Sequence, residues 1–421
     1  MQQKNKHVKT CGNFTIQGSG KVLCLIAKNF YVFWLLWVCC IFSGQVFGAV
    51  LEKLYEVKIP VESQSQAHRQ AAIKVGFGEL LIRITGDSQF ASSGKAQKIL
   101  RKSENFVHQF RYERIPLRTP KIVDGMENEP AEESASESNP APAPLTPDSP
   151  QLVLAIVFEE NMVNEALWKN NLPVWGKTRP STLVWVAVQD LGQRFLLNAN
   201  EPSDILDALT YYADKRGMPL IFPLTDLTDQ NSISVSDVWG NFSDPILAAS
   251  QRYQPDAVFV GRVFRDPFGG WQARWALYQG EQLDTWEIWG QDIKDVVRNG
   301  IDRSTDGLAN RYAQMASSEG NQKIVDLLID DVKSLQDYVK TSDYLVSLAP
   351  VAELQVRGIN ATHIVYRVLL RGQLHGLKQA IALGTLLAVV ENDVKENESN
   401  MLEDQTLLPS EPASFRYRLL P

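Results

Sequence analysis

The clearest hydrophobic pattern in the chain lies between Asp256 and Gln291. Three runs rich in strand-forming residues, DAVFVGRVFRD, WQARWALYQ and LDTWEIWGQ, are joined there by a Phe-Gly-Gly turn and a Gly-Glu-Gln turn. Short turns between such runs predict a β-meander. The stretch also holds four of the eight tryptophans that follow residue 49. Because aromatic side chains bury the largest areas, we expect the main core of the protein to form here.

Before this meander, the pattern predicts a small domain over residues 50–172. Residues 51–60 alternate apolar and polar side chains, which predicts a strand. Ser63–Thr85 repeats apolar residues at intervals of three and four, which indicates a helix ended by Gly86. A second helix is expected over Ser93–Ser103. With the strands and helix that follow, the order of elements in this domain is β-α-α-β-β-α.

The two later strands of this domain flank a stretch of different composition. Phe106–Ile115 alternates and Gln151–Phe158 is apolar, so each predicts a strand. Residues 117–150 are rich in Pro, Glu, Ser and Ala and are expected to be disordered, because they cannot bury enough apolar surface. The stretch is either a linker between domains or an insertion in a hairpin. We favour the insertion, because the first strand alone would leave an unpaired edge.

Residues 173–317 predict a central, Trp-rich α/β domain. Helices alternate with strands up to Tyr253, the three meander strands follow, and a helix from Ile293 to Met315 closes the domain. This order predicts two layers with a mixed sheet.

Residues 318–421 predict a third domain with the order β-α-β-β-α-β, which is the ferredoxin-like plan. The acidic run Glu391–Asp404 is expected to be an exposed loop, and Ser414–Leu419 is expected to return as an edge strand. The fold class is therefore α+β, with three small α/β layered domains.

The first 49 residues differ from the rest of the chain. They contain five lysines and no acidic residue, and no residue from Phe30 to Leu51 is charged. A basic flank, an apolar centre and a small-residue exit are typical of a signal peptide or of an uncleaved membrane anchor. In both cases the positively charged flank stays on the cytoplasmic side of the membrane. We therefore expect the chain from residue 52 onward to be extracytoplasmic, in the periplasm.

Cysteine usage and charge narrow the classes of function. All four cysteines lie in the first 49 residues, so the rest of the chain has no disulfide and no cysteine nucleophile. The net charge of −7 less the five lysines of that segment gives −12 for residues 50–421. Such a charge argues against nucleic-acid binding, which needs a basic surface.

Three sequence features give only weak support for a chemical site. Gly176-Lys177-Thr178 is similar to the end of a phosphate-binding loop, but Asn171 stands where that loop needs glycine. The carboxylates Asp226, Asp229 and Asp237 could hold a hard cation, yet the glycine and glutamate of a calcium loop are missing, so a capping role is favoured. The histidines after residue 49 have no zinc spacing. We therefore assign no catalytic residue, metal ligand or cofactor.

The charged residues of the meander suggest another kind of site. Arg262, Arg274 and Glu287 would form a cross-strand ion network on the solvent face if the strands pair in register. The bolder hypothesis is a partner-binding sheet face on which arginines and tryptophans act as anchors. Its candidate residues are Arg262, Arg274, Trp271, Trp275, Trp286, Glu287 and Trp289.

Several stretches resemble a known family. They are LYEVKIPV with RQAAIKVGFGELLIRITG, LPVWGKTRPSTLVWVAV, RGMPLIFPLTDLTD, and AASQRYQPDAVFVGRV with GWQARW. They are similar to the proteobacterial envelope family of unknown function numbered two thousand and sixty-six, over nearly all of residues 51–390. The resemblance implies an extracytoplasmic protein and supplies no activity.

These observations lead to a functional expectation. We expect a non-enzymatic accessory protein that binds envelope proteins or the cell wall, with the inner membrane as a further partner if the N-terminal segment is uncleaved. One alternative is a hydrolase or transferase of unrecognised type, with a site near residues 173–180 and 225–237. A small-ligand sensor is the other.

Overall fold

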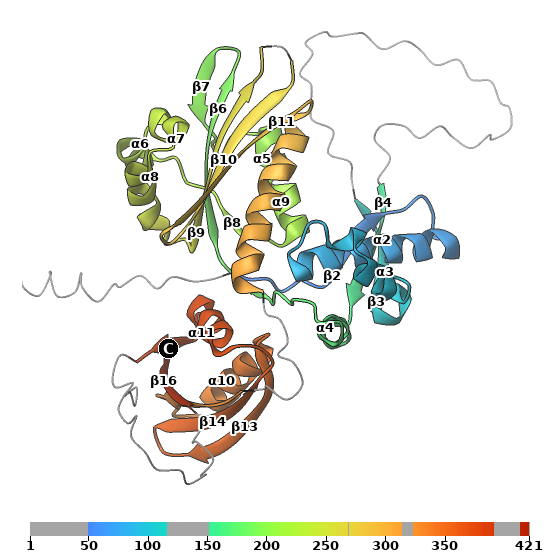
Figure 1. The fold of residues 1–421 in the computed structure, drawn as a ribbon, viewed down its shortest axis with the longest axis vertical. Helices are drawn as coiled ribbons and strands as arrows, with labels where there is room; N and C mark the ends of the chain where they lie inside the picture. Colours follow the sequence, from blue (N-terminus) through green and yellow to red (C-terminus); the bar gives the residue numbers. More distant parts are fainter. Residues whose placement is uncertain (1–48, 116–150, 268, 314–322, 391–412, 421) are drawn as a thin grey trace, which may run out of the picture. The chain divides into compact units, whose positions relative to one another are not determined.

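The computed structural model describes residues 49–115, 151–267, 269–313, 323–390 and 413–420. All of them belong to one compact body, Val46–Pro421. They form a mixed α/β structure with sheets of two, three, five and six strands (Figure 1). The expected α+β class is therefore confirmed. The leader segment and the acidic stretch 117–150, for which a signal and disorder were predicted, lie outside the described residues, apart from Ala49.

The first unit is a three-stranded sheet covered by helices. Its strands are β2 (Glu56–Pro60), β3 (Val107–Ile115) and β4 (Gln151–Phe158), in the order β2-β4-β3, and its helices are α2 (Gln66–Thr85), α3 (Gly94–Leu100) and α4 (Glu160–Lys169), with short 3-10 turns at Phe90–Ser92 and Ser103–Phe106. Ser65 caps α2, and Gly86 ends it in the left-handed region at φ 73°.

Strands β3 and β4 form an antiparallel hairpin. Val107 pairs with Phe158 at one end, and Ile115 pairs with Gln151 at the other. Residues 116–150 therefore separate two paired strands, which confirms the prediction that the acidic stretch interrupts a hairpin.

The second unit contains the predicted meander. The meander consists of β9 (Ala257–Arg265), β10 (Trp271–Gln279) and β11 (Gln282–Gly290). Each of these strands pairs antiparallel with the next, and β9 also pairs in parallel with β6 (Thr182–Asp190). The sheet order is β11-β10-β9-β6-β7, with β7 at Gln193–Leu196 and a short β8 (Leu220–Ile221) also on β6. The remaining pair is β1 (Ala49–Val50) with β5 (Thr178–Arg179).

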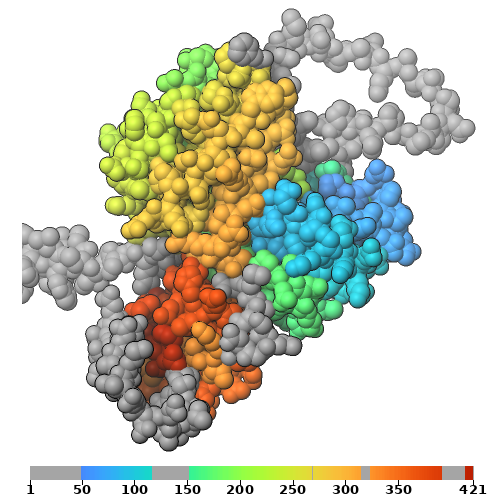
Figure 2. All heavy atoms as spheres, viewed as in Figure 1, coloured from blue at the N-terminus to red at the C-terminus, as the bar shows by residue number. Residues whose placement is uncertain are grey.

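Helices pack on both faces of this six-stranded sheet. On one face, α5 (Asp204–Arg216) and α9 (Ile293–Tyr312) cover the largest core, and α9 contributes to the orange part of the surface in Figure 2. On the other face lie α6 (Leu227–Ser232), α7 (Val235–Gly240) and α8 (Ser243–Ser250), followed by a 3-10 turn at Gln251–Tyr253. The alternating residues of the central strands are therefore apolar on both sides.

Glycine allows one indole to fit between the sheet and α9. A Cβ atom on Gly261 of β9 would lie 2.4 Å from the Trp275 ring, and one on Gly300 of α9 would lie 2.6 Å from it. Trp275 is fully buried and stacks on Phe259, with ring centroids 4.8 Å apart. The expected main core therefore forms around the meander.

The third unit follows the order β-α-β-β-α-β up to β15, and a further strand, β16, comes after it. Its elements are β12 (Ile324–Asp330), α10 (Leu335–Ser347), β13 (Val351–Ile359), β14 (His363–Leu370), α11 (Leu374–Leu383), β15 (Leu387–Val389) and β16 (Ala413–Leu419). The sheet order is β13-β14-β12-β16-β15. The prediction that Ser414–Leu419 forms an edge strand is wrong, because β16 pairs in parallel with β12 and antiparallel with β15, and so lies between them.

A fully buried arginine connects distant parts of the chain. Arg179 donates five hydrogen bonds to backbone oxygens, at 2.8–3.2 Å, which belong to Arg83, Trp175, Gly176, Arg216 and Gly217. Burial, and then the neighbouring Arg83, lower the pKa of Arg179 to about 9. Five oxygen acceptors nevertheless favour the charged form of the guanidinium at neutral pH.

Arg216 extends this arrangement to helix α9. Its guanidinium forms ion pairs of 2.6 Å with Asp302 and with Asp306, and it donates to the backbone oxygen of Gly86. Asp306 also accepts hydrogen bonds from the backbone and hydroxyl of Ser88. Helices α2, α5 and α9 are thus joined by polar contacts as well as by apolar packing.

Candidate functional site

Part of one face of the six-stranded sheet carries charged side chains instead of a helix layer. Beyond the core under α6–α8, Arg262 lies opposite Arg274 on β10, and Arg274 lies opposite Glu287 on β11. The Arg274 and Glu287 side chains are 50% and 46% exposed. The part of the sheet face that carries these charged side chains is therefore open to solvent.

Aromatic side chains lie beside this row. Trp289, two residues after Glu287, projects from the same face of β11 and is 52% exposed. Trp239 of α7 lies against two guanidinium groups, 4.2 Å from that of Arg194 and 5.1 Å from that of Arg262. The six residues Arg194, Trp239, Arg262, Arg274, Glu287 and Trp289 are referred to below as the arginine patch.

Three of the residues predicted for this face point to the opposite side of the sheet. Trp275 and Trp286 are buried in the core beneath α9, and Trp271 packs against the same core. Successive side chains of a strand alternate between faces. Trp271 and Trp275 therefore lie opposite to Arg274, and Trp286 lies opposite to Glu287. The prediction of one shared face is wrong for these three tryptophans.

The charges of the patch are not balanced. Arg274 donates through its Nε to Glu287, which confirms this part of the predicted cross-strand ion network, whereas no ion pair of Arg262 is found among the described residues. Arg194 instead donates to Gln189 at 2.7 Å, and the guanidinium of Arg262 lies over the rings of Trp239 and Phe264, at 5.1 and 5.6 Å from their centroids. Among the described residues, neither of these two arginines forms an ion pair with a carboxylate. The patch thus presents three guanidinium groups and one carboxylate.

Arg262 is the most enclosed of the three arginines. Its Nε atom is buried and has no hydrogen-bond partner within the described chain. Burial, followed by the nearby charge of Arg274, lowers the pKa of Arg262. A partly desolvated cation beside like charges gains most from an added anion, so Arg262 marks the part of the patch suited to a negatively charged group.

The sequence did not identify Arg194 and Trp239 as site residues. Arg194 comes from β7, which pairs with β6. Trp239 comes from the six-residue helix α7, which stands between β8 and β9 in the sequence. The Asp190-Leu-Gly turn signals the β7 hairpin and hence the approximate position of Arg194. No pattern in the sequence places Trp239 against it.

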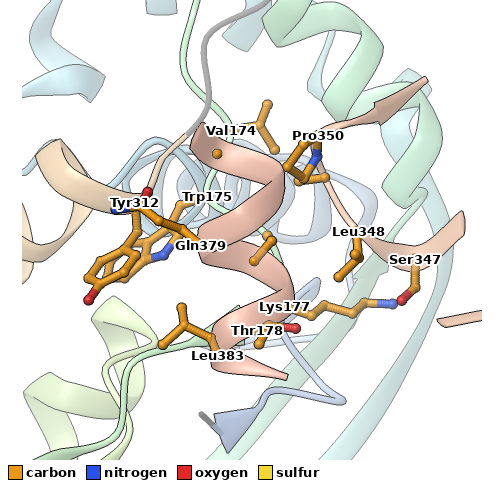
Figure 3. A pocket seen from close by; sticks show the side chains of 14 residues that line it. Val174, Trp175, Lys177, Thr178, Tyr312, Ser347, Leu348, Pro350, Gln379 and Leu383 are labelled. Atoms are coloured by element: carbon orange, nitrogen blue, oxygen red, sulfur yellow. The ribbon is translucent and has the colours of Figure 1, made fainter. Parts of the chain in front are cut away.

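The 173–180 crossing surrounds only a small cavity. The cavity measures about 30 Å³ and is lined by Val174–Thr178, Tyr312, and residues of α10, α11 and the turn after α10 (Figure 3). The Nε1 atom of Trp175 and the Oε1 atom of Gln379 are buried without hydrogen-bond partners among the residues that the structure describes, and a cavity of this size can hold about one water molecule between polar groups. A substrate-sized pocket is not formed there.

The phosphate-loop interpretation also lacks support at this crossing. Thr178 lies in strand β5 and does not begin a helix, and Lys177 pairs with Glu160 at 2.6 Å. The residues that would wrap a phosphate in such a loop are engaged in strand pairing and an ion pair.

The acidic loop at residues 225–237 serves capping and ion pairing. Asp226 caps α6, and Asp237 completes a capping box with Ser234. Arg252 binds both Asp226 and Asp229, at 2.8 Å. The hydrogen bonds from Arg252 hold the pKa of Asp226 well below its usual range. The predicted structural role of these carboxylates is confirmed. In the ranges that the structure describes, no three His, Cys, Asp or Glu side chains gather to hold a metal ion.

A groove of about 820 Å³ lies elsewhere, between residues 50–58 and 210–222, with Glu79 and Arg83 of α2 in its wall. Several of its charged groups already have partners. Lys215 pairs with Glu79 at 2.9 Å, and Arg83 donates to three backbone oxygens. The groove has the size of a small-molecule site, but its four cationic side chains are matched by four carboxylates, whereas guanidinium groups outnumber carboxylates in the arginine patch.

The fold and the patch together define a mixed α/β protein with an exposed guanidinium and aromatic surface. A family model described as a domain of unknown function (DUF8605) matches residues 49–176, the three-stranded unit and the crossing. No curated protein matches the chain. The match agrees with the expectation of an uncharacterised domain family and does not extend to the arginine patch. Within the described ranges, no helix is both long enough and apolar enough to cross a bilayer.

Proposed function

We propose that this protein is a non-enzymatic accessory protein of the cell envelope, which binds a partner protein through the arginine patch. The observation that carries the proposal is the pair of arginines, Arg194 and Arg262, that lie against Trp239 without a carboxylate partner in the described chain. Arginine and tryptophan are enriched at the energetic centres of protein interfaces. Trp289 adds a half-exposed indole on the same face.

The extracytoplasmic placement is part of this proposal. It is supported by the basic, acid-free segment of residues 1–49, by the uncharged stretch 30–51, and by the absence of cysteine after residue 49. Membership of the proteobacterial envelope family numbered two thousand and sixty-six is proposed on the same footing, from the motifs between residues 51 and 390. Fractionation of cells that carry a C-terminal tag tests the placement, and a tag found in the cytosol would contradict it.

Affinity capture from cell envelopes tests the binding role. Tagged protein is compared with the variant Trp289→Ser and with the control Leu335→Ser, because Leu335 is 78% exposed but lies on α10, away from the sheet that carries the patch. We expect the same partner protein with the wild type and with the control, and its loss with Trp289→Ser. Equal recovery by all three proteins would place the interface elsewhere, and co-sedimentation with purified cell wall alone would indicate a polymer ligand.

The groove supports a second candidate, a small-ligand sensor. Its volume of about 820 Å³ is the specific observation in favour. A ligand that binds only the folded state raises the melting temperature. A metabolite screen should then find a compound whose stabilisation is lost in Lys215→Ala, and a screen without such a compound would remove this candidate. The hydrolase or transferase alternative gains no support from the crossing or from the acidic loop.

A further inference from the structure

We infer that the cluster of Arg194, Trp239 and Arg262 is a subsite for carboxylate side chains, and that the partner of the arginine patch is an acidic peptide segment. This inference rests on the proposed binding function and specifies the chemistry of the partner. Its basis is charge complementarity at a surface where guanidinium groups outnumber the carboxylates.

The stacking geometry leaves donor groups available. A guanidinium that lies against an indole uses its π face, while its N–H groups point outward in its own plane. Arg194 uses Nε for Gln189, and Arg262 has a buried Nε without a partner in the described chain. The terminal nitrogens of both residues remain for an acceptor. A carboxylate can accept two parallel hydrogen bonds from such a fork.

A comparison within the same strand shows what is missing at the cluster. Arg265, three residues after Arg262, also stacks on an indole, that of Trp271, at 4.5 Å. Arg265 has its own carboxylate, since it pairs with Asp190 at 3.0 Å. Arg194 and Arg262 show the same stacking without the acid. The protein as a whole carries a net charge of −7, so a cationic surface without local compensation is a departure from its general character.

Like charges also face each other across the strands. Arg262 and Arg274 are direct cross-strand neighbours, and such pairs are unfavourable unless an anion lies nearby. Glu287 supplies one anion to Arg274. An incoming carboxylate at Arg262 would supply the second, and it would do so where partial burial strengthens the interaction.

The spacing of the patch indicates the form of the partner. Trp289 on β11 lies two strand spacings across the sheet from β9 and two residues along from the position opposite Arg262, which is roughly 12 Å in all. A peptide in the polyproline II conformation has three residues per turn and rises about 3.1 Å per residue, so side chains three positions apart lie on the same side and about 9 Å apart. Such a peptide, with an acidic residue and an apolar residue three positions apart, would direct both side chains to the sheet, and the lengths of the side chains would cover the remaining distance between Arg262 and Trp289.

The test measures binding of a labelled peptide with three Glu-Ser-Ser-Leu repeats to the full-length protein by fluorescence anisotropy. A peptide with Gln in place of each Glu is the ligand control. We expect binding of the Glu peptide that weakens with added salt, a loss of about ten-fold or more in affinity for Arg262→Gln and for Arg194→Gln, and an unchanged affinity for Arg265→Gln. Arg194 is exposed, so its variant remains informative if Arg262→Gln does not fold.

Several results would overturn the inference. They are equal binding of the Glu and Gln peptides, an equal loss with Arg265→Gln, or binding of tripolyphosphate with no binding of either peptide. If envelope capture still depends on Trp289 while the Glu peptide does not bind, the carboxylate chemistry is wrong and the binding function stands. If capture is also independent of Trp289, the binding function itself is wrong.

Discussion

Replacement of Arg179 by methionine tests whether a single buried guanidinium couples the first unit to the central one. The side chain serves five backbone oxygens from the end of α2, the end of α5 and the crossing between them. Methionine fills part of the volume but donates no hydrogen bond. Each buried oxygen that loses its donor costs about 1–3 kcal/mol. The losses are not additive, since part of the cost of burying the charge is recovered.

We therefore expect Arg179→Met to lower the free energy of unfolding by about 3–5 kcal/mol, the range found when one member of a buried charged interaction is removed. Guanidinium chloride unfolding followed by circular dichroism measures this loss. Differential scanning calorimetry should in addition show a broader or divided transition, because residues 49–172 lose a contact to α5. Arg265→Met is the control, since Arg265 forms an exposed ion pair that contributes about 1 kcal/mol or less. If the two variants lose the same stability, Arg179 does not have the role assigned to it.

Two further predictions concern the central unit. Gly300→Ala should destabilise the protein by about 1–3 kcal/mol through overpacking against Trp275. Gly307→Ala on the same helix is the control, because a Cβ atom there has no contact closer than 3.6 Å, and it should stabilise the protein by up to about 1 kcal/mol. The midpoints of urea unfolding distinguish these outcomes, and equal effects of the two substitutions would contradict the packing described for Trp275. Asp256→Asn tests a pH effect. Burial raises the pKa of Asp256 above its ordinary value, and Ser181 partly opposes this, so the folded state binds the proton more tightly and stability should rise as the pH falls through the raised pKa. The asparagine variant should show a smaller rise in the free energy of unfolding as the pH is lowered from neutrality towards the ordinary pKa of a carboxyl group.

The meander was predictable because its signals are local. Runs of strand-forming residues end at turns with Gly269, Gly270 and Gly280, all of which have positive φ angles. The register that follows from these turns also aligns Arg262 with Arg274. These parts of the fold depend on residues within a few positions of each other.

The assignment of tryptophans to faces failed for a physical reason. Helices cover both sides of the sheet, so an apolar residue on either side satisfies the same pattern. The two-residue turn between Gln279 and Gln282 pairs odd-numbered residues of β10 with even-numbered residues of β11. Trp275 therefore lies opposite Trp286, on the same face of the sheet. Alternation along β11 alone separates Trp286 from Glu287, since adjacent residues of a strand point to opposite faces.

The long-range polar contacts could not be predicted from the sequence. Arg179 lies in the short strand β5, and its partners lie up to 96 positions away. Trp239 meets Arg194 only because α7 returns over the sheet. Such contacts depend on how elements pack, and no local pattern specifies them.

The position of β16 has a consequence for synthesis and for engineering. Because this strand lies inside the C-terminal sheet, β12 and β15 leave the ribosome before the strand that must fill the space between them. A nascent chain therefore carries two unpaired strand edges until β16 is made, and such edges are prone to aggregate. Deletion of residues 413–419 should leave the same edges permanently open, so shortened expression products of this protein should be insoluble.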